Sequence, residues 1–118
     1  MTVLMKVREG STEPITFVMK ERDRETNVLA TTDLTGYTKA EIRLRSKRQK
    51  KTQSFDTDDA ELSCAFDATG EVVFRPAATT LEHKSEGYWV RFVLTNASAK
   101  AVHVPSERDD EIEVLEAW

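Results

Sequence analysis

The chain has 118 residues, 39% of them hydrophobic and 32% charged, a balance that is ordinary for a soluble protein of one domain, residues 1–118. Its formal net charge of −4 gives no overall attraction to nucleic acid or to an anionic membrane surface. The single cysteine excludes an internal disulfide, and no apolar run approaches the ~20 residues of a membrane-spanning helix. We therefore expect a soluble protein made in a reducing cytoplasm.

The first half of the chain is dominated by an alternation of apolar and polar residues with a period of two, which predicts strands. Turn-forming residues separate the first two segments at 11–14, and a charged connection follows at 21–26. The predicted strands of this half span residues 3–7, 15–19 and 39–45.

Residues 33–37, Asp-Leu-Thr-Gly-Tyr, form a turn-like motif directly before the third of these strands. A polar turn that carries two large apolar side chains is typical of a corner between two sheets. We expect Leu34 and Tyr37 to close the end of the core, with the tyrosine hydroxyl at its edge. We also expect Gly36 to supply a backbone angle that other residues resist.

The second half continues the same pattern, with turn residues at 67–70 and 95–98. Residues 77–87 are the one segment that suggests a helical turn. The whole chain then contains about eight or nine strands, at the spacing that is typical of an antiparallel sandwich or barrel. The sequence therefore predicts an all-β fold, and the strands of this half span residues 62–66, 72–74, 88–94, 102–104 and 112–114.

Residue types that catalyse reactions or bind metals are few. His83 lies in a polar connection, His103 lies on a short predicted strand, and Cys64 is in phase with the core residues of its own strand. Residues 56–61 contain three aspartates, but they lack the glycine that a calcium loop requires at its sixth position. We expect no enzymatic activity, no cofactor and no metal.

A basic cluster follows the corner motif, and an acidic segment at 56–61 follows the basic cluster. One interpretation is a long solvated hairpin whose two arms neutralise each other. The other is a basic surface that meets an acidic protein or nucleic acid; nucleic acid is disfavoured because no aromatic residue is interleaved for base stacking. The candidate partner-binding residues of this cluster are Arg43, Arg45, Lys47, Arg48, Lys50 and Lys51.

Two tryptophans complete the set of candidate partner-binding residues. Trp89 is out of phase with the apolar side of its strand, so it faces away from the core. Trp118 either docks on its own domain or anchors in a partner subunit, where tryptophan is favoured. Together with Tyr88, these rings also suit an alternative function, the binding of carbohydrate or of a host surface. Residues 107–116 predict an acidic edge strand.

The order of these features resembles the immunoglobulin-like N-terminal domain of phage baseplate upper proteins and related small β-sandwich proteins of tailed-phage virions. The resemblance extends from about Ile15 to Leu115. The segments that carry it are ITFVMKERD, DLTGYTKAEIRLR, TGEVVFRP, EGYWVRFVLTNASAKAVHVP and EIEV.

This resemblance implies an immunoglobulin-like antiparallel β-sandwich of about eight strands. It also implies a non-enzymatic virion component, made in the host bacterial cytoplasm, that docks to other virion proteins. We expect self-association or assembly on a symmetric ring, and no contact with membrane. The longer members continue into a stalk or receptor-binding region, so an adaptor, connector or head-decoration role is expected rather than attachment to a receptor.

Overall fold

The computed structural model describes residues 2–22, 25–82, 87–104 and 110–115. The regular secondary structure in this part of the chain consists of β-strands alone, which confirms the prediction of an all-β fold. The segment 77–80 closes one turn through a hydrogen bond from the Thr80 N–H to the Ala77 carbonyl (3.0 Å), and no helix follows within the described residues.

The larger sheet contains six strands, and its main path runs β1-β11-β9-β5-β6 with β10 paired to β9. Its two longest strands, β5 and β9, pair side by side along nearly their whole length. The bounds are β1 (Thr2–Arg8), β5 (Tyr37–Ser46), β6 (Thr52–Asp56), β9 (Tyr88–Asn96), β10 (Ala101–Val104) and β11 (Asp110–Leu115).

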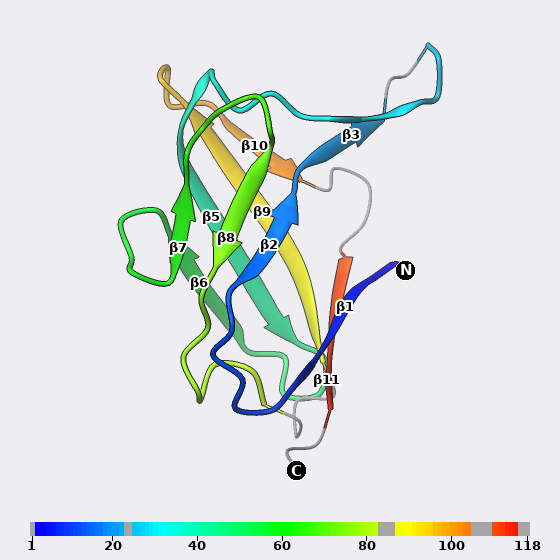
Figure 1. The fold of residues 1–118 in the computed structure, drawn as a ribbon, viewed down its shortest axis with the longest axis vertical. Coiled ribbons are helices and arrows are strands. Elements are labelled where there is room, and N and C mark those ends of the chain that lie inside the picture. The colour runs from blue at the N-terminus through cyan, green and yellow to red at the C-terminus, as the bar shows by residue number, and fades with distance from the viewer. Residues whose placement is uncertain (1, 23–24, 83–86, 105–109, 116–118) are drawn as a thin grey trace.

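The smaller sheet has the order β2-β8-β7 and lies in front of β5 and β9 in Figure 1. Its strands are β2 (Ile15–Val18), β7 (Leu62–Cys64) and β8 (Glu71–Phe74). A separate two-stranded ribbon, β3 (Lys20–Arg22) with β4 (Leu29–Thr31), extends away from the two sheets at the upper right.

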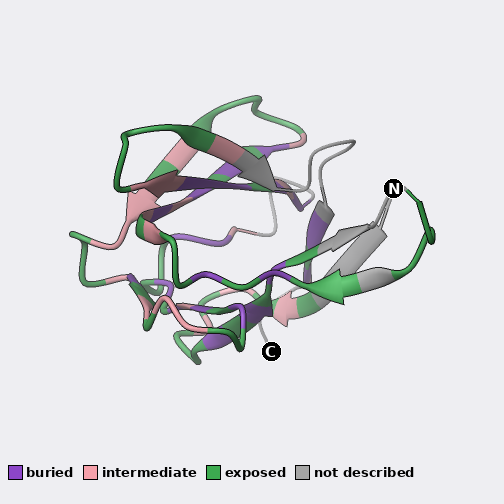
Figure 2. Ribbon diagram, turned by 90° about the horizontal axis from the view of Figure 1, so that it is seen from above, coloured by how far each residue is buried: buried purple, intermediate pink, exposed green. Residues whose placement is uncertain are grey.

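The core lies between the two sheets because each strand turns alternate apolar side chains toward the other layer. Phe17 of β2 meets Phe92 of β9 edge to face, with ring centroids 5.0 Å apart. Phe55 of β6 and Phe74 of β8 make a second contact across the layers, at 5.5 Å. Figure 2 shows the buried segments between the layers and the exposed ones largely in the loops around them.

The corner at residues 33–37 closes one end of this core, as the sequence predicts. Leu34 is completely buried, and its N–H donates to the Asp67 carbonyl at 2.9 Å. Asp33 shapes the turn by accepting a hydrogen bond from the Thr35 N–H at 3.0 Å. The prediction for Gly36 is wrong: its φ is not positive, and a β-carbon there would meet no atom within 4 Å.

The structure differs from the sequence prediction in two further respects. The sandwich is not wholly antiparallel, because β1 and β11 pair in parallel. These strands come from the two ends of the chain, so no short hairpin connection forces them to run in opposite directions. The described residues also contain β3, β4 and β6 beyond the predicted strands, giving eleven in all. β3 and β4 have only three residues each, and β3 and β6 are largely polar, so the alternation of side chains alone does not reveal these strands.

Candidate docking surface

The candidate site lies on the outer face of the larger sheet, the face turned away from the smaller sheet. Ala40, Ile42 and Leu44 of β5 point into the core and are completely buried. Because side chains alternate along a strand, the residues between them point outward. Arg43 and Arg45 are therefore exposed on this face.

Two rows of side chains cross the centre of this face. In the first row, Arg45 lies opposite Trp89 of β9, and Trp89 lies opposite Glu111 of β11. The Arg45 guanidinium carbon is 6.0 Å from the centre of the Trp89 ring, in a cation–π arrangement. In the second row, Arg43 lies directly opposite Arg91 of β9. We name Arg43, Arg45, Trp89 and Arg91 the arginine–tryptophan cluster.

Arg91 is the member of this cluster that sequence reasoning missed. It lies far from the basic cluster along the chain, and only the pairing of β5 with β9 brings it opposite Arg43. The alternation within β9 did place Arg91 and Trp89 on the same side of that strand. The sequence could therefore have shown that Arg91 lies on the same face as Trp89. It could not have shown that Arg91 lies opposite Arg43, because the register between two strands is a property of the tertiary structure.

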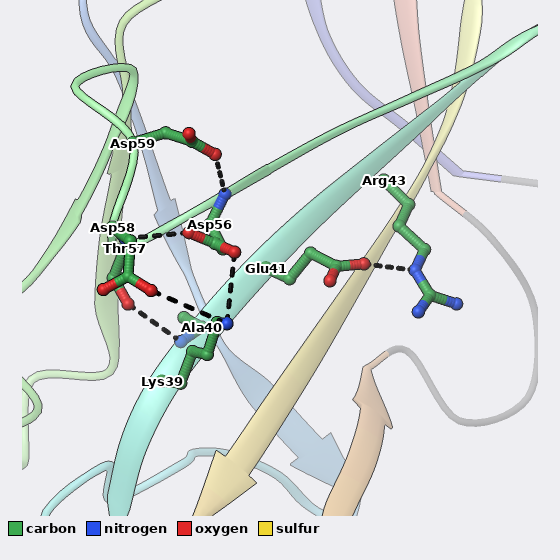
Figure 3. Close-up of polar contacts among 8 residues, drawn as sticks. All are labelled: Lys39, Ala40, Glu41, Arg43, Asp56, Thr57, Asp58 and Asp59. Carbon is green, nitrogen blue, oxygen red and sulfur yellow. Dashed lines mark hydrogen bonds and ion pairs between the residues drawn. The ribbon is translucent and has the colours of Figure 1, made fainter.

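Ion pairs surround the arginine–tryptophan cluster. Glu41 accepts a hydrogen bond from Nε of Arg43 (Figure 3). Lys47 donates to Glu111, a carboxylate that is buried at the edge of the face. Lys47 therefore ties the turn after β5 to β11, and its Nζ is engaged within the domain.

The remaining residues of the predicted basic cluster occupy a tight turn between β5 and β6. The Ser46 N–H donates to the Lys51 carbonyl at 2.8 Å, and the Lys50 N–H donates back to the Ser46 carbonyl at 3.0 Å. Arg48, Lys50 and Lys51 are exposed around this turn. The structure thus separates the predicted cluster into two outward-facing arginines on the sheet, one lysine paired within the domain and three cations on the turn.

The acidic segment after β6 does not neutralise these cations. The carboxylate of Asp56 lies 3.2 Å from Nζ of Lys39, and that of Asp58 lies 3.7 Å from the same nitrogen (Figure 3). Asp56 also accepts a hydrogen bond from the Asp58 N–H at 2.8 Å, and Asp59 accepts one from the Asp56 N–H at 2.8 Å. These aspartates shape the turn and pair with Lys39, a residue outside the basic cluster.

The hydrogen bond from the Asp58 N–H, with the nearby Lys39, lowers the pKa of Asp56. A lowered pKa in the folded state stabilises the fold above the unfolded pKa of about 3.9, and this contribution is lost as the pH falls through the folded pKa. We expect Asp56→Asn to unfold more easily than wild type at neutral pH, and the gap to shrink below about pH 4. Urea unfolding at a series of pH values measures the difference in the free energy of unfolding. A gap that does not vary with pH would contradict it.

Tyr88, the first residue of β9, holds the connection from β8 onto the core. Its side chain is buried, with 2% of its surface exposed. The hydroxyl donates to the Thr80 carbonyl at 3.3 Å and accepts a hydrogen bond from the Glu82 N–H at 2.9 Å. One side chain thus satisfies two backbone groups of residues 80–82. Sequence reasoning placed Tyr88 on the core side of its strand but did not predict this bridge.

We expect Tyr88→Phe to lower the free energy of unfolding by about 1–2 kcal/mol, because it leaves two backbone groups without this partner. Chemical denaturation with circular dichroism measures the change. Tyr37→Phe is the matched control: Tyr37 is the other tyrosine of the chain, and its hydroxyl has no hydrogen-bond partner among the described residues. Equal losses in the two variants would argue against the proposed role of the Tyr88 hydroxyl.

A polar pocket of about 300 Å³ lies beside the same connection. Its lining includes Lys51, Ser46 and Gln53. Ser46 Oγ accepts from the Gln49 N–H at 3.0 Å, and Gln53 Nε2 donates to the Thr80 carbonyl at 3.1 Å. Ser46 and Gln53 thus hold the turn against the connection.

The other sequence-predicted residues are placed as follows. Cys64 packs beside the core, where burial raises the pKa of its thiol. His103 lies on β10. Trp118 and His83 lie outside the described residues, as do 107–109 and 116 of the predicted acidic edge strand. Residues 110–115 of that segment form β11, but the prediction of an edge strand is wrong, because β11 lies between β1 and β9.

Metal-binding clusters and membrane-spanning helices are both absent from the described residues. Residues 2–22, 25–82, 87–104 and 110–115 contain no group of three or more histidine, cysteine or acidic side chains arranged to hold a metal ion. The same residues contain no helix with the length and apolar character needed to cross a membrane.

The chain was also compared with known proteins. No protein-family model matches it, and no curated protein is found as a relative.

Proposed function

We propose that this protein is a non-enzymatic structural subunit of a tailed-phage particle, an immunoglobulin-like module that acts by docking to neighbouring virion proteins. The observation that supports the immunoglobulin-like part of the proposal is the strand order of the two facing sheets, while the virion role rests on the sequence resemblance. Together with the sequence resemblance, this order favours an immunoglobulin-like module over other β-sandwiches.

In an immunoglobulin domain, strands B, E and D are neighbours in one sheet, and strands C, F and G are neighbours in the other. The order β2-β8-β7 fits B-E-D, and the order β5-β9-β11 fits C-F-G. On this assignment β6 takes the place of C′, the strand that variable-type domains add beside C. Chain order and spatial order then agree for all of these strands.

Tyr88 gives independent support for this assignment. Many immunoglobulin domains carry a tyrosine near the start of strand F whose hydroxyl bonds to the backbone a few residues upstream. Tyr88 opens β9 and donates to the Thr80 carbonyl eight residues earlier. The valine two residues later, Val90, occupies the place of the second disulfide cysteine and is completely buried. Apolar packing fills that position here.

Mass spectrometry of purified virions tests the proposed function. A structural subunit is expected at a copy number comparable with other components of the tail or head, and assembly on a symmetric ring predicts a multiple of the ring's symmetry. Absence of the protein from washed, intact particles would reject the proposal. Its position within the particle, in the tail, neck or head surface, follows from the neighbours to which it can be crosslinked.

A carbohydrate-binding role has weaker support, because the aromatic platform it requires is partly engaged. Arg45 lies over the Trp89 ring, so a sugar stacking on that side would have to displace the guanidinium. Glycan arrays test this alternative, and binding that is lost on replacing Trp89 by alanine would favour it.

A further inference from the structure

We propose that the arginine–tryptophan cluster is the docking surface and that it binds a carboxylate-rich segment of a partner protein. This inference rests on the proposed function in one respect, namely that the module works by protein docking. Beyond the proposed function, it states which surface docks and what chemical groups the partner presents to that surface.

The first argument is the pairing of like charges. Arg43 and Arg91 lie directly opposite each other on neighbouring strands. Like charges at opposed positions of an antiparallel pair destabilise a sheet, while an apolar or oppositely charged pair would stabilise it. Arginines at opposed positions of neighbouring strands can bind one anion together, since the planar N–H groups of a guanidinium bind carboxylates in bidentate geometry.

The second argument is that the carboxylates of this face already have cationic partners. Glu41 pairs with Arg43, and Glu111 pairs with Lys47. Glu113 of β11 lies 3.8 Å from Lys6 of β1. Arg45, in contrast, has no carboxylate partner within the part of the chain that the structure describes, and it stacks on Trp89. The centre of the face therefore holds one guanidinium group, that of Arg45, that no carboxylate of the described residues balances.

The third argument is the arrangement of polar groups next to the cluster. The exposed residue Ser54 of β6 lies opposite Arg43, and Thr52 lies opposite Arg45. The rows Arg91–Arg43–Ser54 and Trp89–Arg45–Thr52 form a continuous patch of hydrogen-bond donors with one aromatic ring. An acidic peptide segment fits such a patch, because its carboxylates meet the arginines and its apolar groups meet Trp89.

Charge around the patch favours a peptide over a nucleic acid. The patch is bordered by Glu41 and Asp56 on one side and by Glu111 on the other. A nucleic acid carries a negative charge at every phosphate, so its backbone would run across these carboxylates. A short peptide carries its acidic groups at chosen positions and places them on the arginines alone.

The test uses the fluorescence of Trp89. The chain has two tryptophans, so Trp118→Phe leaves Trp89 as the reporter. The probe is a short synthetic peptide with glutamate at alternate positions and leucine between them, which is expected to draw Arg45 toward its carboxylates and to change the Trp89 emission. Saturable binding that weakens as salt is raised is the expected result. No change in emission or in calorimetry at low salt would overturn the proposal.

Variants of the same reporter protein locate the site. Arg91→Glu is expected to weaken peptide binding by at least about tenfold, because it replaces a charge-assisted hydrogen-bond donor with a repelling charge. Lys100→Glu makes the same change of charge at an exposed position in the turn between β9 and β10 and should bind like the parent. Equal losses in both variants would show only a general effect of net charge and would overturn the assignment of the site.

Two controls keep the outcomes distinct. Arg91→Gln removes the charge without adding an acid, and it is expected to bind the peptide with an affinity between those of the parent and Arg91→Glu. It replaces Arg91→Glu as the test if that variant proves poorly folded. A single-stranded oligonucleotide of equal charge is titrated in parallel, and tighter binding of this probe would overturn the choice of a protein partner. Peptide binding is measured on the isolated protein, and its failure would reject the docking surface even if the protein is found in virions. Absence of the protein from virions would reject the proposed function even if the peptide binds.

Discussion

Replacing Leu34 with alanine is expected to lower the free energy of unfolding by about 3 kcal/mol, within the ~2–5 kcal/mol typical of a fully buried leucine. Leu34 belongs to the corner at residues 33–37 and has none of its surface exposed. Its removal opens a cavity at the end of the core, which the corner cannot collapse to fill. The Leu34 N–H is bonded to the Asp67 carbonyl and the Tyr37 N–H to the Leu34 carbonyl, so the backbone is held in place.

Urea unfolding measures this loss, with Val28→Ala as the control. Val28 is also a large apolar residue, but 58% of its surface is exposed, so its truncation is expected to change stability by less than about 0.5 kcal/mol. A loss at Leu34 as small as that at Val28 would mean that the corner does not close the core in solution.

Replacing Gly87 with alanine is the second substitution with a large expected effect. Gly87 has a φ of +100°, where residues with a side chain are strained, and a β-carbon there would lie 2.8 Å from the Ile112 carbonyl oxygen of β11. Strain and the displacement of β11 together are expected to cost about 2–4 kcal/mol. Since β11 connects β1 to β9, the variant should also loosen the edge of the larger sheet.

The matched control is Gly36→Ala, which makes the same chemical change where the backbone and the surrounding space permit it. Gly36 does not have a positive φ, and a β-carbon there has no neighbour within 4 Å. Its replacement is expected to be neutral, or to stabilise slightly by restricting the unfolded chain. Hydrogen exchange of the β11 amides provides the second readout. Rapid exchange is expected in Gly87→Ala alone, and protection equal to that of wild type would contradict the close contact.

Much of the fold was predictable because most strands of this protein have one buried face. Alternation at 39–45 and 88–94 predicted the two central strands, and the side chains expected in the core are buried there; Val93, which is out of phase with them, is buried as well. Alternation carries no information on register, direction or partner. The parallel pairing of β1 with β11 and the short ribbon of β3 and β4 therefore appeared only in the structure.

The candidate surface was predictable only in part, for a related reason. Arg43, Arg45 and Trp89 were identified from charge and from phase along single strands. Counting charges along the chain also grouped Lys47 with these arginines, whereas the fold pairs it with Glu111, a residue 64 positions away. Distance along the sequence is a poor measure of electrostatic neighbourhood in a sheet, because the nearest neighbours of a residue lie on other strands.

The sequence by itself determined that this protein is an all-β chain, which residues face its core, and that Leu34 closes one end of it. These properties follow from the local period of side chains and from turn chemistry, which short segments carry within themselves. The tertiary structure alone decided that Arg91 lies opposite Arg43, that Gly87 is constrained while Gly36 is not, and that Tyr88 bridges to residues 80–82. Each of these depends on contacts between separate segments, whose register and approach are set when the two sheets pack around a common core.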